Sequence, residues 1–189
     1  MGTVLFVNAC MRGKDSNTLK LCQEYLSKKD KDIIEEVTLN ELQLAPLTGE
    51  KAAYRMEKQA ENNWNDPIFE YAKQMAQADE IVIGTPYWDL SFPAALKTYL
   101  EYCCVCDITF HYTNEGRPEG LCKSKTMTYI TTSGGFIADK NYGYDYLCGL
   151  ADMLSLGKTR FISAEGLDII GMDVEGQMKK ARNAISELD

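Results

Sequence analysis

Hydroxyl and amide side chains gather in one short loop that follows the first apolar run of the chain. The loop is residues 10–18, and it ends in Ser16, Asn17 and Thr18 before a stretch with helical apolar spacing. Backbone N–H groups, the positive end of the helix dipole and side-chain hydroxyls converge at such a helix start. The loop therefore predicts a site for a phosphate monoester. The alternative is that Asp15 or Ser16 only caps the helix.

Two further loops combine residue types that suit a planar, polar-edged ligand. Residues 85–93 contain three aromatic residues and two prolines, and flat side chains on a stiff backbone can back a planar ring. Residues 131–136 pair two glycines with hydroxyls, so backbone N–H groups can approach a ring edge closely. Taken alone, the aromatic loop could be the start of a core helix and the glycine loop could be a plain turn. The prediction of a ligand site therefore depends on the loops lying together in the fold.

The elements that must position these loops alternate between apolar runs and helical patterns. This alternation predicts an α/β fold with a five-stranded, doubly wound parallel sheet and helices on both faces. We expect strands at residues 3–8, 33–39, 80–85, 125–132 and 159–164. We expect helices at residues 17–29, 64–77, 93–104, 143–156 and 174–188. Segment 40–63 lacks periodicity and indicates a long, mobile, partly helical connection. Loops 9–18, 85–92 and 132–142 should meet where the strand order reverses.

Composition limits the class of protein and its partners. The 189 residues contain no Pro, Gly or Ser-rich linker, which predicts one domain over residues 1–189. The 20 basic and 28 acidic residues give a net charge of −8, which disfavours nucleic acid and anionic membranes as partners. We find no targeting segment and no apolar run that could span a bilayer, so we expect a cytoplasmic protein.

The cysteines are odd in number and scattered, which indicates reduced thiols rather than a disulfide framework. They are the seven residues Cys10, Cys22, Cys103, Cys104, Cys106, Cys122 and Cys148. The cluster at 103–106 has a CxxC spacing, but neither it nor His111 nearby has enough partners for a metal or iron–sulfur site. Leu96, Leu100 and Cys103 share one helical face, so we expect Cys103 to pack in the core and Cys104 or Cys106 to point elsewhere.

Four stretches of sequence together resemble one enzyme family. They are residues 86–97, residues 109–121, residues 130–135 and residues 164–166. In combination they are similar to the FMN-dependent NADH azoreductase and NAD(P)H quinone reductase family. The resemblance implies a flavodoxin-like fold, bound FMN and a homodimer. It also implies hydride transfer from NADH or NADPH through FMN to a quinone, an azo compound or a similar small electrophile.

The resemblance assigns the phosphate contacts to individual residues. Ser16 and Thr18 match the family's hydroxyl contacts, and Asn17 lies between them. Cys10 stands where the family usually has a serine, and a thiol is a poor hydrogen-bond donor. We therefore expect Cys10 to pack against the loop and Arg12 to supply the missing contact.

The resemblance also assigns the contacts to the flavin ring. The ring-contacting positions are Pro86, Tyr87, Trp88, Asp89, Leu90, Thr132, Ser133, Gly134 and Gly135. A carboxylate would oppose the negative charge of a reduced flavin, so we expect Asp89 to face it with its backbone. Phe110 and Tyr112 match hairpin aromatics that the family places over the partner subunit's flavin. Residues 136–138 replace a histidine that the family often carries, so no catalytic acid or base is assigned.

Two other classes of protein compete with this interpretation. A flavodoxin-type electron carrier would also bind FMN and suit an acidic surface. An iron–sulfur flavoprotein would use the cysteines at 103–106, but it lacks a fourth ligand. The aromatic hairpin favours the enzyme, because a carrier exposes only the edge of its flavin.

Overall fold

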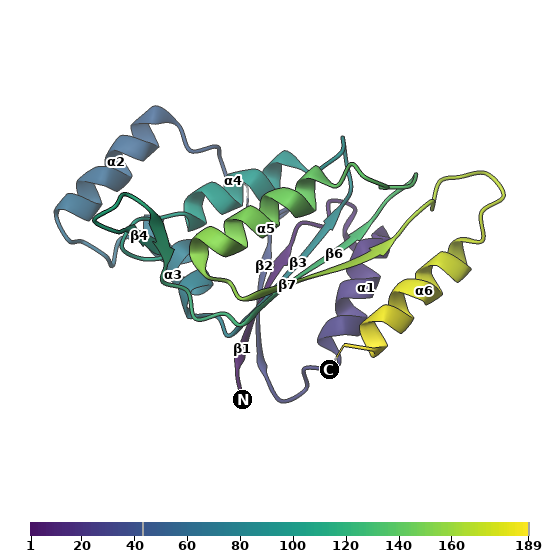
Figure 1. The fold of residues 1–189 in the computed structure, drawn as a ribbon. Coiled ribbons are helices and arrows are strands. Elements are labelled where there is room, and N and C mark those ends of the chain that lie inside the picture. The colour runs from purple at the N-terminus through teal and green to yellow at the C-terminus, as the bar shows by residue number, and fades with distance from the viewer. Residues whose placement is uncertain (43, 189) are drawn as a thin grey trace.

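A five-stranded parallel sheet forms the centre of the computed structural model, which describes residues 1–42 and 44–188 (Figure 1). The strand order is β2-β1-β3-β6-β7. The strands are β1 (Thr3–Asn8), β2 (Ile33–Thr38), β3 (Glu80–Pro86), β6 (Thr126–Thr132) and β7 (Lys158–Ala164). This order reverses between β1 and β3, as in flavodoxin-like proteins. The predicted fold class and all five predicted strands are confirmed, each strand to within about a residue at either end.

Helices cover both faces of the sheet, which explains the continuous apolar runs of its central strands β1 and β3. One face carries α3 (Glu70–Gln77), α4 (Ala94–Cys103) and α5 (Tyr142–Leu154), and the other carries α1 (Asn17–Leu26) and α6 (Val174–Ser186). Leu5 and Val7 of β1 enter the first core, while Val4 and Phe6 enter the second. Among the described residues, no helix is both long and apolar enough to cross a membrane.

The predicted helices differ from the observed ones in three places. The first helix ends at Leu26, three residues early, and the helix expected from residue 64 begins only at Glu70. Residues 67–69 before it form a 3-10 turn, and the Ile68 N–H donates to Asp66 Oδ1 at 3.0 Å. The expected connection at 40–63 contains a complete helix, α2 (Gly49–Ala60). Gln43 of that segment, like Asp189, lies outside the described residues.

Helix α2 has no buried residue and contacts the rest of the chain through polar side chains. Lys51 Nζ donates to the Tyr102 hydroxyl at 3.2 Å, and Arg55 donates to the backbone carbonyl of Glu101 at 3.0 Å. Because no residue of α2 is buried, an apolar stripe packed on the core does not hold this helix in place. The structure therefore resolves the predicted partly helical connection into one helix that polar contacts attach to the rest of the chain.

A short antiparallel hairpin stands apart from the main sheet. Its strands are β4 (Phe110–Tyr112) and β5 (Pro118–Gly120). Gly120 lies against the backbone of Leu154, at the C-terminal end of α5. Since α5 runs antiparallel to the strands, this contact places the base of the hairpin toward the amino end of the sheet. The predicted hairpin is confirmed, and it lies away from the edge where the three loops meet (Figure 1).

Candidate functional site

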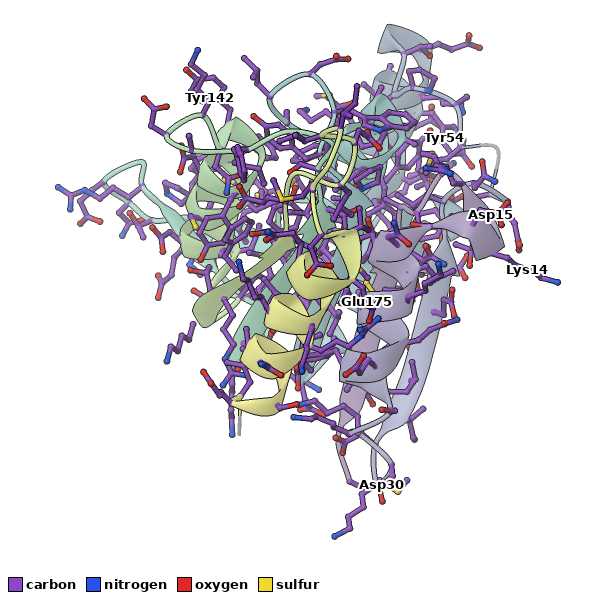
Figure 2. All side chains as sticks on the ribbon, turned by 90° about the vertical axis from the view of Figure 1, so that its right-hand side faces the viewer. Lys14, Asp15, Asp30, Tyr54, Tyr142 and Glu175 are labelled. Carbon is purple, nitrogen blue, oxygen red and sulfur yellow. The ribbon has the colours of Figure 1, made fainter. Side chains whose placement is uncertain are left out.

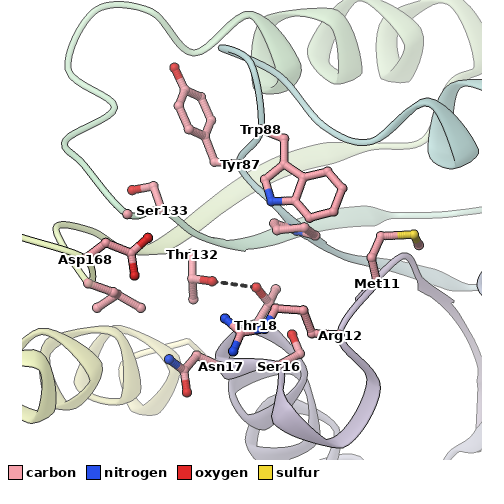
Figure 3. A pocket seen from close by; sticks show the side chains of 13 residues that line it. Met11, Arg12, Ser16, Asn17, Thr18, Tyr87, Trp88, Thr132, Ser133 and Asp168 are labelled. Atoms are coloured by element: carbon pink, nitrogen blue, oxygen red, sulfur yellow. Dashed lines mark hydrogen bonds between the residues drawn. The ribbon is translucent and has the colours of Figure 1, made fainter.

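A cleft opens at the carboxyl edge of the sheet, where the loops after β1, β3, β6 and β7 meet (Figure 3). The residues that line it are Met11, Arg12, Ser16, Asn17, Thr18, Pro86, Tyr87, Trp88, Thr132, Ser133, Gly134, Leu167 and Asp168. The three loops that the sequence predicted to meet do so. The loop after β7 also lines the cleft, and it was not among the predicted loops.

The start of α1 supplies hydrogen-bond donors to this cleft. Ser16 is the N-cap, and its Oγ accepts a hydrogen bond from the Leu19 N–H at 3.2 Å. The N–H groups of Asn17 and Thr18 lie in the first turn, where no carbonyl of the same helix accepts them. Lys14 and Asp15 of the preceding turn project outward from the protein (Figure 2). Ser16 therefore caps the helix and lines the cleft at once, so the two interpretations of this loop are compatible.

One hydroxyl pair joins the loop after β1 to the loop after β6. Thr18 Oγ1 and Thr132 Oγ1 are 2.7 Å apart, a distance at which either oxygen can donate. Thr18 is almost fully buried. The Arg12 side chain reaches across this pair in the close view, which puts a guanidinium beside the helix start (Figure 3). The floor of the cleft therefore combines positive charge with hydroxyl donors, as an anion site requires.

The aromatic loop after β3 contains a tight two-residue turn. Trp88 and Ser91 exchange two backbone hydrogen bonds of 3.0 and 2.8 Å, and the residues between them, Asp89 and Leu90, have φ angles of 51° and 67°. Two successive positive φ angles define a type I′ turn. The turn presents Trp88 at the cleft with 46% of its surface exposed. Asp89 and Leu90 were predicted site residues, but neither lines the cleft.

Tyr87 connects the aromatic loop to the loop after β6. Its hydroxyl donates to the Lys140 carbonyl at 2.7 Å, and its backbone N–H donates to the Thr132 carbonyl at 2.9 Å. Figure 3 shows the ring directed away from the floor of the cleft. Tyr87 lines the cleft as predicted and also holds two of its loops together.

Glu165 holds the segment that stands in place of the family's histidine. Its carboxylate accepts hydrogen bonds from the Ile137 N–H at 2.9 Å and from the Ser163 hydroxyl at 2.8 Å. Phe136 of this segment is 63% exposed. The carboxylate therefore acts as an anchor for the backbone after the paired glycines.

Two other predicted site residues lie outside the cleft. Cys10 is buried below the loop, where its thiol donates to the Gly84 carbonyl at 3.6 Å, and a hydrogen bond with Cys22 lowers the pKa of this thiol. Gly135 follows the lining residues but does not itself line the cleft. The expectation that Cys10 only packs agrees with its position, because the side chain has turned toward the core.

Three lining residues were missed, namely Met11, Leu167 and Asp168. Leu167 and Asp168 follow the last strand of the sheet. Since the carboxyl ends of all parallel strands share one edge, the predicted strand at 159–164 already indicated this fourth loop.

The cysteine cluster lies at the end of α4 and away from the lining residues of the cleft. Cys103 is fully buried in the core, as its spacing with Leu96 and Leu100 predicted. Cys104 and Cys106 are half-buried, and burial raises the pKa of Cys104 to about 11. No three His, Cys, Asp or Glu side chains of the described residues come together as metal ligands.

Comparison with known proteins places the chain in a family. A family model described as the flavodoxin-like fold matches residues 2–188. A protein of Clostridium acetobutylicum named FMN-dependent NADH:quinone oxidoreductase 2 is 36% identical over 189 residues, covering 95% of this chain and 94% of that protein. The chain belongs to this flavodoxin-like family. The resemblance found in the sequence is therefore confirmed.

Solved structures of this flavodoxin-like family agree with the fold. An FMN-dependent NADH-azoreductase from Bacillus anthracis, determined in complex with FMN, has a TM-score of 0.82 at 22% identity, with 100% and 99% of the two chains covered. The azoreductase AzrA has a TM-score of 0.76 at 25% identity, with 97% and 99% covered. The flavodoxin-like arrangement thus extends over nearly the whole chain.

Proposed function

We propose that this chain is an FMN-dependent NAD(P)H oxidoreductase that reduces quinones, azo compounds or similar small electrophiles. The observation that carries the proposal is the cleft at the point where the strand order reverses. There a helix start with hydrogen-bond donors for an anion, an aromatic loop and a loop of glycines and hydroxyls meet. The Clostridium acetobutylicum relative, by its name, is an enzyme of this kind. That name supports the reductase over the electron carrier and the iron–sulfur flavoprotein.

The residues of the cleft fit FMN. Arg12, Ser16, Asn17 and Thr18 would hold the phosphate, because their donors converge at one helix start. The flavin ring would contact the parts of the predicted loops that line the cleft, at 86–88 and 132–134. The cleft has a volume of about 150 Å³, less than the roughly 300–1,000 Å³ of pockets that enclose a ligand of this size. Part of the cofactor would therefore stay outside it, accessible to a second molecule.

The chain's own contribution to the reaction is orientation and electrostatics. When bound, FMN supplies the hydride chemistry between the nicotinamide and the acceptor. Trp88 and the turn that carries it would support the ring, and backbone N–H groups of the glycine loop would stabilise negative charge at its polar edge. Asp89 does not line the cleft, so we assign its carboxylate no role at the ring.

An anaerobic titration tests the proposed activity. The purified protein, supplied with FMN, should bind it and show a flavin spectrum. About one equivalent of NADH or NADPH should then bleach that spectrum, because the hydride passes to the flavin. A protein that binds FMN but is not bleached by either nucleotide would be a carrier, and the reductase proposal would be wrong.

We further propose that the active form is a cytoplasmic homodimer. Tyr112 is 62% exposed and packs edge-to-face on Phe110, with ring centroids 5.5 Å apart. Neither aromatic lines the cleft of its own chain, and the cleft leaves part of FMN uncovered. A hairpin from a second copy would supply this cover. All seven cysteines are free thiols, which supports a reducing compartment.

Tyr112→Ala should keep FMN binding within about twofold and lower acceptor turnover by up to about tenfold, the range of one aromatic contact. Titration of FMN and steady-state quinone reduction measure the two effects. Tyr112→Phe keeps the ring and should retain turnover. Light scattering that shows a fully active monomer would contradict the proposal.

A further inference from the structure

Asp168 brings a carboxylate into a cleft whose other polar side chains include a guanidinium, an amide and several hydroxyls (Figure 3). Within the part of the chain that the structure describes, this carboxylate has no hydrogen-bond or ion-pair partner. An ionised carboxylate only accepts hydrogen bonds. Asp168 is exposed to solvent, so the cleft presents a carboxylate acceptor that no protein group occupies, next to the helix start that attracts an anion.

The position of Asp168 is fixed by the backbone around it. Gly166, Leu167 and Asp168 donate through their N–H groups to the carbonyls of Gly135, Ser133 and Gly134, each at 3.0 Å. These three bonds fasten the loop after β7 to the loop after β6. Asp168 is therefore held beside the cleft by the same backbone that forms its wall.

The Asp168 carboxylate occupies space that is free only because residue 134 is a glycine. A Cβ atom at this position would lie 2.2 Å from Asp168 Oδ2, far inside a van der Waals contact. Any side chain at 134 would push the carboxylate away from its place. The glycine thus has a second use besides close backbone approach, since it keeps Asp168 in the cleft wall.

A carboxylate so placed repels a phosphate and favours neutral donors. FMN consists of a phosphate, a flavin ring and a sugar-alcohol chain between them, whose hydroxyls are neutral donors. We propose that Asp168 accepts hydrogen bonds from these ribityl hydroxyls and so positions the flavin between its two ends. The proposal rests on the proposed function, because it takes FMN as the ligand.

The negative charge of Asp168 should also make the cleft discriminate between FMN and inorganic phosphate. A free phosphate ion meets the donors of the helix start but also the repulsion of Asp168, and it has no hydroxyl chain to offset that repulsion. FMN meets the same repulsion and offsets it through its ribityl chain. Asp168 should therefore raise the preference of the cleft for flavin over inorganic phosphate.

Titration with three flavins tests this role. Riboflavin has the ribityl chain without the phosphate, and lumiflavin has neither. Asp168→Ala should weaken riboflavin binding about tenfold, because hydrogen bonds to a charged group are lost. FMN binding should weaken by less, since the repulsion of its phosphate is also relieved, and lumiflavin binding should not change. Inorganic phosphate should compete more strongly against FMN in Asp168→Ala and in the isosteric Asp168→Asn than in the parent.

Asp139→Ala is the matched control, because it removes one exposed carboxylate from a neighbouring loop outside the cleft. It should leave all three flavin affinities unchanged, and thermal unfolding should confirm that each variant folds. If riboflavin binds equally well to Asp168→Ala and the parent, or if lumiflavin is weakened as much, the role of Asp168 is wrong. If the parent binds no flavin, the proposed function itself fails.

Discussion

Replacing Ser16 and Thr18 together by alanine should weaken FMN binding about 100-fold. Each hydroxyl lines the cleft at the start of α1, and a hydrogen bond to a charged group is worth about 1.5–3 kcal/mol. Two such bonds to the phosphate correspond to at least about two orders of magnitude in affinity. The dissociation constant of FMN, measured by fluorescence titration, gives the result.

The controls separate phosphate binding from helix capping. Ser16→Ala also removes the N-cap of α1, which costs about 1 kcal/mol of stability. Thr48→Ala removes the equivalent cap of α2 far from the cleft lining, so it should lower stability without changing FMN affinity. Riboflavin has no phosphate and should bind the double variant almost as it binds the parent. An unchanged dissociation constant for FMN would refute the assignment of the phosphate site.

Gly120→Ala should lower the free energy of unfolding by about 3 kcal/mol, the upper range for overpacking a close contact. A Cβ at this position would lie 2.1 Å from the carbonyl carbon of Leu154 and 2.3 Å from the Ser155 nitrogen. Both are backbone atoms, and Ser155 ends α5 in the left-handed conformation, with φ at 58°. The contact can be relieved only by moving the hairpin off the helix. Urea denaturation measures the loss.

Gly149 provides the comparison within the same helix. No atom lies within 4 Å of a Cβ built there. Gly149→Ala should therefore be neutral or stabilise the protein by up to about 1 kcal/mol, because alanine favours the helix. If Gly120→Ala and Gly149→Ala unfold at the same urea concentration, the close packing of the hairpin on α5 is not a constraint on the fold.

The central strands β1 and β3 were predictable because burial on both faces leaves an apolar signal in each of them separately. Continuous apolar runs such as residues 4–7 need no knowledge of their neighbours. Residues 40–63 were expected to be only partly helical, and the contacts that fix α2 there are polar ones, from Lys51 and Arg55 to partners about 50 residues away along the chain. The spacing of residues within a segment cannot predict polar contacts to residues that are distant in the sequence.

The residues of the cleft were predictable where their types or their clustering are rare in a sequence. They were not predictable where the residue type is common in surface loops. Paired glycines, clustered aromatics and a hydroxyl-rich helix start stand out in a sequence. Asp168 does not, since a carboxylate in a loop is the commonest kind of surface residue. Its place beside Gly134 follows from the pairing of β6 with β7, a contact between segments distant in sequence. The predicted strand at 159–164 places the loop of Asp168 at this edge, and the assembled sheet shows which residue it meets there.

The turn that carries Trp88 has a consequence for attempts to make this protein more heat resistant. Type I′ turns are normally built from asparagine and glycine, whereas this one uses Asp89 and Leu90. A left-handed conformation costs a non-glycine residue about 1–2 kcal/mol, so glycine at position 90 is an obvious choice for an engineer. That choice would also free the backbone that fixes Trp88 at the mouth of the cleft. Thermostability and a rigid support for the cofactor therefore compete at this one residue.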